Sequence, residues 1–81
     1  MDLRERIRDK IASTALPTSK PRAVVRKDAD GEQCSACDRA VQRNERQIEF
    51  EYQGRGMVRL HVGCYAIWIA ELIERGWLHV A

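Results

Sequence analysis

The chain has few cysteines and no long apolar run, and both features narrow the class of protein. Its 81 residues include only three cysteines, Cys34, Cys37 and Cys64. An odd number cannot pair completely within one chain, so we expect no disulfide framework of the kind that holds small secreted domains together. No apolar run reaches the about 18 residues that a membrane-spanning helix needs. Residues 1–6 are mostly charged, unlike a secretory signal peptide, and we expect a soluble, cytoplasmic protein without membrane association.

The chain is also too short to build a large core. A domain of this length buries only roughly 60 to 65% of the surface that its unfolded chain exposes. Small domains of this kind usually need an additional stabilising element, such as a disulfide or a bound metal. Because the cysteine count argues against disulfides, the sequence favours a metal.

The net charge is small but unevenly distributed. The formal charge is +2, yet residues 1–27 carry eight basic and three acidic side chains, whereas residues 28–81 carry six basic and nine acidic ones. A basic arm can attract nucleic acid or an acidic protein surface. Helices rich in arginine and glutamate are more often solvated faces, so the charge alone does not assign a partner.

Four metal-ligand side chains occur as two pairs with the same spacing. Cys34 and Cys37 form the first pair, and His61 and Cys64 follow after 23 intervening residues. Zinc prefers thiolate and imidazole ligands, and a two-residue separation lets both members of a pair reach one ion. We therefore expect one structural Zn²⁺ bound by all four side chains. Three thiolates and a neutral imidazole give a site of formal charge −1 with no open position, which predicts a non-enzymatic protein.

Other uses of the cysteines fit the sequence less well. A thioredoxin-type CxxC motif begins a helix after a strand, whereas a polar loop follows Cys37. A hydrolase would use His61 and Cys64 as base and nucleophile, but both are better used together on a metal. Burial of Cys34 and Cys37 as ordinary apolar residues is the remaining alternative.

The N-terminal segment has the pattern of an amphipathic helix over residues 2–15. Apolar residues recur every fourth position between charged ones: Leu3, Ile7, Ile11 and Ala15. Asp2 is a suitable cap for the first turn, and Pro17 should end the helix. Residues 17–33, with two prolines and many charged side chains, predict a linker. Within it, residues 23–25 favour a short strand.

The segment between the ligand pairs predicts a β-hairpin. In residues 47–53, Ile48, Phe50 and Tyr52 alternate with glutamates, as in a half-buried strand. Glycines at 54 and 56 favour a tight reversal, and residues 57–60 return with Val58 and Leu60 on one face.

The C-terminal part predicts a helix from residue 61 or 62 to residue 75, with Gly76 as a left-handed cap. Apolar side chains occupy nearly the whole circumference of this helix, and we expect Glu71 and Glu74 to face water. Such a helix has to be covered on more than one side. The hairpin and the N-terminal helix are the natural covers, and any remaining apolar surface is a candidate site for a protein partner or a second copy.

The order of these elements resembles the treble-clef class of zinc fingers over about residues 33–76. In that class a knuckle, here Cys34 to Cys37, precedes a β-hairpin and a helix whose first turn carries the second ligand pair, here His61 and Cys64. The ligand order is also similar to that of the first half of a LIM domain and of the finger of poly(ADP-ribose) polymerases. The chain departs from these families because it has no second zinc module and carries Asp38 where a knuckle commonly has glycine. Aspartate tolerates the left-handed conformation better than most residues.

The fold class expected from these patterns is a small α+β zinc-binding domain. Its parts are an N-terminal helix over residues 1–16, a linker over residues 17–33 and a treble-clef-like module over residues 34–81. The leading hypothesis for function is a small adaptor or regulator that binds a protein partner, or a second copy, through apolar helix surfaces.

The alternative hypothesis is a nucleic-acid-binding regulator, with weak and unspecific binding. It would use the basic arm and the hairpin arginines: Arg4, Arg6, Arg8, Lys20, Arg22, Arg26, Lys27, Arg55 and Arg59. The position of four glutamates discriminates the two hypotheses: Glu49, Glu51, Glu71 and Glu74. If they lie beside the basic residues, they neutralise the field that nucleic acid requires.

Overall fold

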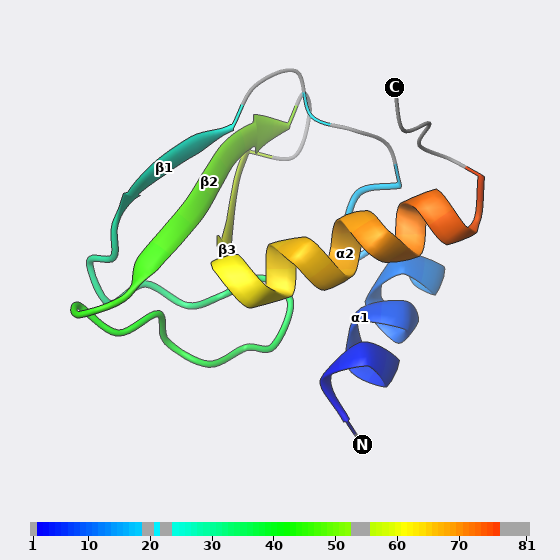
Figure 1. The fold of residues 1–81 in the computed structure, drawn as a ribbon, viewed down its shortest axis with the longest axis horizontal. Coiled ribbons are helices and arrows are strands. Elements are labelled where there is room, and N and C mark those ends of the chain that lie inside the picture. The colour runs from blue at the N-terminus through cyan, green and yellow to red at the C-terminus, as the bar shows by residue number, and fades with distance from the viewer. Residues whose placement is uncertain (1, 19–20, 22–23, 53–55, 77–81) are drawn as a thin grey trace.

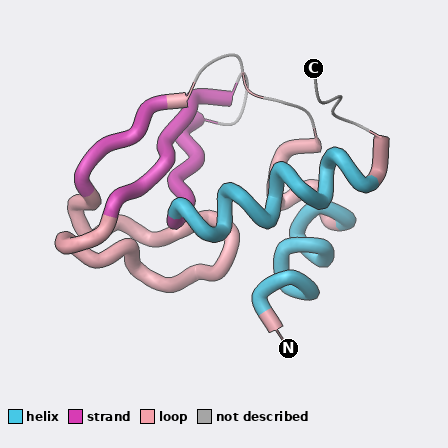
Figure 2. The backbone as a smooth tube through the Cα atoms, in the orientation of Figure 1, coloured by secondary structure: helices cyan, strands magenta, loops and turns pink. Residues whose placement is uncertain are grey.

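The structure is a computed structural model that describes residues 2–18, 21, 24–52 and 56–76. These residues form two helices and three strands in the order α1 (Leu3–Ala12), β1 (Val25–Asp28), β2 (Arg46–Tyr52), β3 (Gly56–His61) and α2 (Val62–Glu74). The strands form one antiparallel sheet in the order β1-β2-β3. Figures 1 and 2 show the sheet on one side of the molecule and the two helices crossing on the other. The α+β fold class is confirmed at this level.

Helix α1 begins where the sequence predicts and ends earlier. The Asp2 carboxylate accepts a hydrogen bond from the Glu5 backbone N–H at 2.8 Å, which caps the first turn. The helix stops at Ala12, and Thr14 adopts a left-handed conformation with φ of 62°. The prediction that Pro17 ends the helix is therefore wrong. The turn at Thr14 buries Leu16 completely and leaves Ala15 exposed, so apolar burial decides where this helix ends.

The sheet confirms the predicted buried face for four residues of the hairpin, whereas the burial of Tyr52 lies outside what the structure describes. Ile48 pairs with Leu60, and Phe50 pairs with Val58; all four side chains are buried. Gly56 has a positive φ of 81° after the predicted reversal, whose residues 53–55 lie outside the described part of the chain. The short strand expected at residues 23–25 lies at Val25–Asp28 instead, where it pairs with β2.

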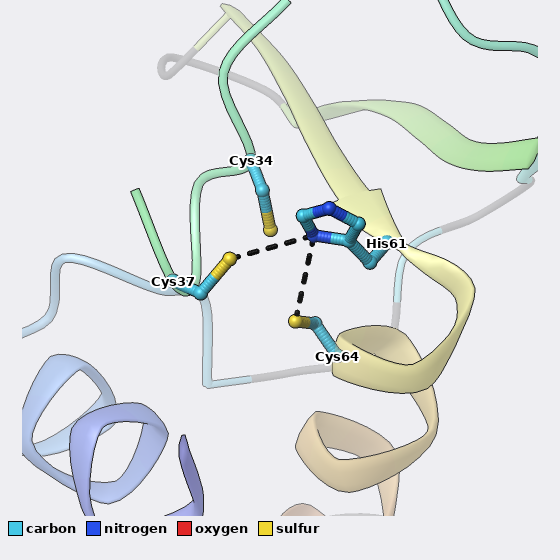
Figure 3. Close-up of side chains that lie close together, drawn as sticks. All are labelled: Cys34, Cys37, His61 and Cys64. Carbon is cyan, nitrogen blue, oxygen red and sulfur yellow. Dashed lines mark hydrogen bonds between the residues drawn. The ribbon is translucent and has the colours of Figure 1, made fainter. Parts of the chain in front are cut away.

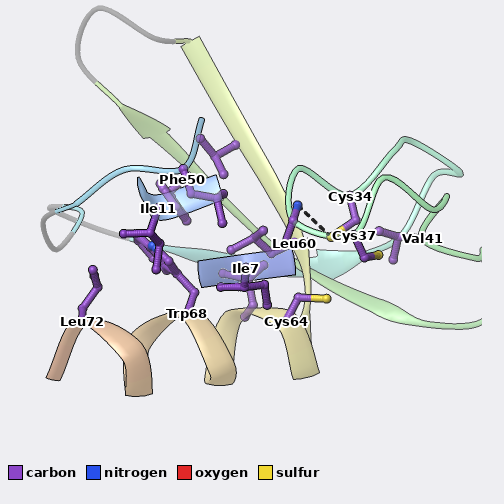
Figure 4. Close-up of a cluster of buried hydrophobic side chains, with 14 of the residues drawn as sticks. Ile7, Ile11, Cys34, Cys37, Val41, Phe50, Leu60, Cys64, Trp68 and Leu72 are labelled. Carbon is purple, nitrogen blue, oxygen red and sulfur yellow. Dashed lines mark hydrogen bonds between the residues drawn. The ribbon is translucent and has the colours of Figure 1, made fainter. Parts of the chain in front are cut away.

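The core lies where α1, the sheet and α2 meet (Figure 4). Trp68 of α2 is completely buried and stacks on Phe50 of β2, with ring centroids 5.3 Å apart and planes 11° apart. Its indole Nε1 donates a hydrogen bond to the carbonyl oxygen of Pro17 at 2.9 Å. Ile7 and Ile11 of α1 are also fully or almost fully buried in this cluster. Trp68 therefore joins the segment after α1 to the sheet.

Glu71 lies buried between the two helices, which corrects the expectation that it faces water with Glu74. Its side chain has no exposed surface, whereas that of Glu74 is 65% exposed. The Arg8 side chain of α1 donates a hydrogen bond to Glu71, and Arg75 Nη1 lies 3.1 Å from the Glu71 Oε1. The hydrogen bond from Arg8 lowers the pKa of Glu71 to about 2. The sequence pattern missed this because the packing of α1, which brings Arg4 and Arg8 to that side of α2, cannot be read from the helix alone.

Neither helix in the described residues combines the length and the apolar character that crossing a membrane requires.

Candidate metal centre

The first ligand pair lies on a tight turn between β1 and β2. The Cys34 backbone N–H donates to the Arg39 carbonyl at 2.8 Å, and the Asp38 N–H donates to the Cys34 carbonyl at 3.0 Å. Asp38 has a left-handed φ of 65°, so aspartate takes the conformation that glycine commonly takes in a knuckle. The Ala36 N–H points at the Cys34 sulfur at 3.4 Å. Such N–H groups stabilise a thiolate.

The second pair lies where the sheet passes into α2. His61 is the last residue of β3 and the N-cap of α2, and Cys64 lies in the first turn of that helix. The positive end of a helix dipole favours the negative charge of a thiolate at this position. Figure 3 shows the four side chains pointing toward one another from these two places.

The distances between the four side chains suit one metal ion. All four ligand atoms lie within 4.8 Å of one another. The His61 Nδ1 lies 3.4 Å from the Cys37 sulfur and 3.8 Å from the Cys64 sulfur. Tetrahedral zinc, with Zn–S of about 2.3 Å and Zn–N of about 2.1 Å, would separate nitrogen and sulfur by about 3.6 Å. The residues are therefore positioned to bind one metal ion through Nδ1 and three sulfurs.

Cys34 and Cys64 influence each other's ionisation. A hydrogen bond from Cys64 lowers the pKa of Cys34, and the same bond raises the pKa of Cys64. Cys34, Cys37 and Cys64 are buried and form no disulfide. Because neighbouring thiolates repel one another, a divalent cation is needed to hold all three in the ionised state.

Helix α1 contributes two basic side chains to the knuckle backbone. Arg6 Nη1 donates to the Cys37 carbonyl at 2.9 Å. Lys10 Nζ donates to the Ser35 carbonyl at 2.9 Å and to the Asp38 carboxylate at 2.6 Å. The sequence pattern places Arg6 in a basic arm and gives no sign of either contact. The i, i+4 spacing of Arg6 and Lys10 places them on one helix face, but it does not identify what that face meets.

The outer nitrogen of His61 faces a carboxylate. His61 Nε2 lies 3.9 Å from the Glu45 Oε1, while Nδ1 faces the sulfurs of Cys37 and Cys64. An open cavity of about 520 Å³ lies beside the ligands. Its charged lining residues are Arg6, Arg39 and Glu45, and it also reaches Cys37, His61 and Cys64. The charges of both signs in this cavity do not select a single class of ligand.

Glu49 of β2 and Glu71 of α2 lie beside basic residues. Glu49 Oε2 lies 3.2 Å from Lys27 Nζ and 3.4 Å from Arg59 Nε. Glu71 Oε2 lies 3.8 Å from Arg4 Nε, in addition to its contacts with Arg8 and Arg75. Lys20, Arg22 and Arg55 lie outside the described residues. Among the described residues, much of the basic charge is thus neutralised locally.

Comparison of the chain with models of known protein families, with characterised proteins and with solved structures gives no match. Function is therefore inferred from the four converging ligands and from the surfaces around them.

Proposed function

We propose that this protein is a structural-zinc domain of the treble-clef type that acts through protein–protein contacts and has no catalytic activity. The observation that carries the proposal is the convergence of Cys34, Cys37, His61 and Cys64 within 4.8 Å from a knuckle and a first helical turn.

The donor set supports zinc as the metal. Thiolate sulfurs favour zinc over magnesium, calcium or manganese, which prefer oxygen ligands. Four protein ligands fill a tetrahedral shell, so neither water nor substrate has a coordination position. The metal would then stabilise the fold instead of performing chemistry.

The charge distribution supports a protein partner over nucleic acid. Glu49 and Glu71 lie within ion-pair distance of four of the basic residues that nucleic acid would need: Arg4, Arg8, Lys27 and Arg59. The side chains of Arg6 and Lys10 already donate hydrogen bonds to carbonyl oxygens of the knuckle. Phosphate binding requires free cationic side chains arranged along one face.

The apolar exterior of α2 supports the same choice. Val62 and Ile73 are each 38% exposed, although both are large apolar residues on a helix with few charges. A contiguous apolar surface on a small domain usually marks an interaction site.

Metal analysis and cobalt substitution test the proposal. We expect one zinc per chain, and we expect the Co²⁺ form to show the absorption of a tetrahedral site with three thiolates. A spectrum with water ligands would contradict the closed site, and a folded protein purified without zinc would contradict the proposal altogether. Cys34→Ser should lose the spectrum, whereas the matched control Ser35→Ala, one residue along the same turn, should retain it.

A further inference from the structure

The open cavity beside the metal centre reaches two of the three cysteine ligands and not the third. Cys37 and Cys64 are among its lining residues, whereas Cys34 is not. The exposed fractions follow the same order, since Cys37 is 9% exposed, Cys64 3% and Cys34 0%. A small molecule that enters the cavity therefore meets Cys37 or Cys64, while Cys34 lies away from it.

The lining of the cavity suits a small, uncharged molecule that both donates and accepts hydrogen bonds. Arg6 and Arg39 supply N–H donors, and Glu45 supplies a carboxylate acceptor. Hydrogen peroxide has this chemistry, and it carries no charge for the thiolates to repel. Peroxide oxidises the thiolate form of cysteine, and exposure decides which thiolate reacts first. The structure therefore favours reaction at Cys37.

We propose that the cavity admits hydrogen peroxide to Cys37, and that oxidation of Cys37 and Cys34 to a disulfide releases the metal. This inference rests on the proposed function, because it concerns the regulation of the same zinc site. The sulfurs are close enough for the reaction, since all four ligand atoms lie within 4.8 Å of one another (Figure 3).

The oxidation takes place in two steps. The Cys37 thiolate attacks one oxygen of the peroxide, so that an S–O bond forms, the O–O bond breaks and hydroxide leaves; the product is a sulfenic acid. The Cys34 thiolate then attacks this sulfur, so that an S–S bond forms, the S–O bond breaks and a second hydroxide leaves. The two thiolates together lose two electrons, which reduce the peroxide. The two hydroxides take up protons from solvent and become water.

The position of Cys34 makes it the attacking thiolate in the second step. A displacement at sulfur is in line, so the attacking sulfur approaches from the side opposite the leaving oxygen. That oxygen lies on the cavity side of Cys37, because the peroxide arrived there. Cys64 shares the cavity side with Cys37, whereas the buried Cys34 does not. The disulfide should therefore join Cys34 to Cys37.

This disulfide removes half of the donor set. Only His61 and Cys64 remain as ligands, and four are needed to close a structural zinc site. Because the fold of a small zinc domain depends on its metal, release should unfold the domain and abolish contacts with a protein partner. Reduction of the disulfide restores the ligands, so the change is reversible, unlike further oxidation of a cysteine to a sulfinic acid.

Peroxide treatment of the zinc-loaded full chain tests the inference. A chromogenic chelator measures the zinc released, and mass spectrometry after alkylation identifies the oxidised cysteines. We expect one peroxide consumed and one disulfide formed for each zinc released, with Cys64 still available for alkylation. Dithiothreitol and added zinc should restore the original circular dichroism spectrum.

Gly63→Leu tests the route through the cavity. Gly63 lines the cavity, and a Cβ placed on it would meet no heavy atom within 4 Å, so leucine can occupy this space without strain. It should slow the peroxide-driven release of zinc about threefold or more, because oxidation of a thiolate follows its exposure. Ala66→Leu, at an exposed position one turn further along α2, is the matched control and should release zinc at the unchanged rate. Before oxidation, both variants should bind zinc as tightly as the unchanged chain.

Three results overturn the inference. The first is retention of zinc in excess peroxide, the second is a disulfide that joins Cys37 to Cys64, and the third is an equal release rate for Gly63→Leu and Ala66→Leu. Each would leave the zinc-domain function intact. Absence of zinc from the folded, untreated chain would instead refute the proposed function itself.

Discussion

Arg6 on α1 donates a hydrogen bond from Nη1 to the carbonyl oxygen of Cys37, a residue 31 positions further along the chain, at 2.9 Å. This bond joins the N-terminal helix to the backbone of the knuckle that carries two of the four metal ligands. Lys10, one helical turn further along, makes the corresponding bond to Ser35. The helix is therefore attached to the metal centre as well as to the apolar core, so that the stability of each should depend on the other.

Loss of Arg6 should loosen this attachment. We expect Arg6→Ala to lower the free energy of unfolding by about 1 kcal/mol, the usual value of a partly exposed hydrogen bond. It should also accelerate zinc transfer to a competing chelator. Urea unfolding and chelator kinetics measure the two effects. Arg43→Ala, in the exposed loop before β2, is the control and should change neither; equal zinc-release rates for both variants would show that α1 does not support the knuckle.

Removal of the metal should unfold the domain. Structural zinc contributes an apparent ~10 to 16 kcal/mol in small fingers, and a core of this size cannot replace it. Cys37→Ser and Cys64→Ser should behave alike, because each removes one ligand from opposite halves of the site. Circular dichroism with and without a chelator measures the loss. Retention of the native spectrum in chelator would contradict a structural role of the metal.

The ion pair of Glu71 should make the free energy of unfolding depend on pH at the acidic end of the range. Its pKa is lowered by the hydrogen bond from Arg8 to about 2, below its ordinary value of 4.5. Its contribution is therefore complete above about pH 4.5 and is lost as the pH falls toward 2. We expect Glu71→Gln to be less stable than the unchanged chain by about 1 to 3 kcal/mol at neutral pH.

The difference between the two proteins should be constant between about pH 8 and about pH 6, because Glu71 stays ionised throughout this range and the thiolate ligands still hold the metal. Urea unfolding of zinc-saturated protein at successive pH values in this range measures it, and a difference that already narrows toward the lower limit would contradict the lowered pKa. Glu74→Gln is the matched control, since its carboxylate lies on the same helix but is 65% exposed. If Glu74→Gln were as costly as Glu71→Gln, burial between the helices would not explain the effect.

Packing of α1 should carry much of the stability of α2. Ile7 is completely buried in the cluster that contains Trp68 and Leu72. Ile7→Ala should destabilise the protein by about 2 to 5 kcal/mol, the range for a large-to-small substitution in a core. Leu3→Ala, at a residue of the same helix that is 37% exposed, should cost far less. Equal urea midpoints for the two variants would mean that α1 does not pack on the core in solution.

Binding to nucleic acid should be weak and should fall steeply as the salt concentration rises. A basic arm that neutralises about four phosphates predicts a fall of roughly two orders of magnitude in affinity between about 50 and 200 mM salt on duplex DNA. Arg55→Ala and Arg22→Ala should reduce any binding equally, as diffuse phosphate attraction requires. Fluorescence anisotropy with two unrelated duplexes measures this. A nanomolar, sequence-dependent affinity that Arg55→Ala alone abolishes would make nucleic-acid binding the leading function.

The sequence by itself identified the four candidate ligands and most of the elements. The paired spacing of Cys34 with Cys37 and of His61 with Cys64 is a local property, because each pair lies within one turn of chain. The alternation of apolar and polar residues around Ile48 and Phe50 also depends only on neighbouring residues in the chain, and so does the helix cap at Asp2.

Only the tertiary structure decided how the helices meet and what they leave exposed. Glu71 is buried because α1 brings arginines to it, and α1 ends early because Leu16 turns into the core. Arg6 and Lys10 bind the knuckle instead of presenting a free basic face. Each of these depends on contacts between residues far apart in the chain. Helical periodicity identifies the faces of a helix but not the partner of each face, since that is set by the packing of the whole domain.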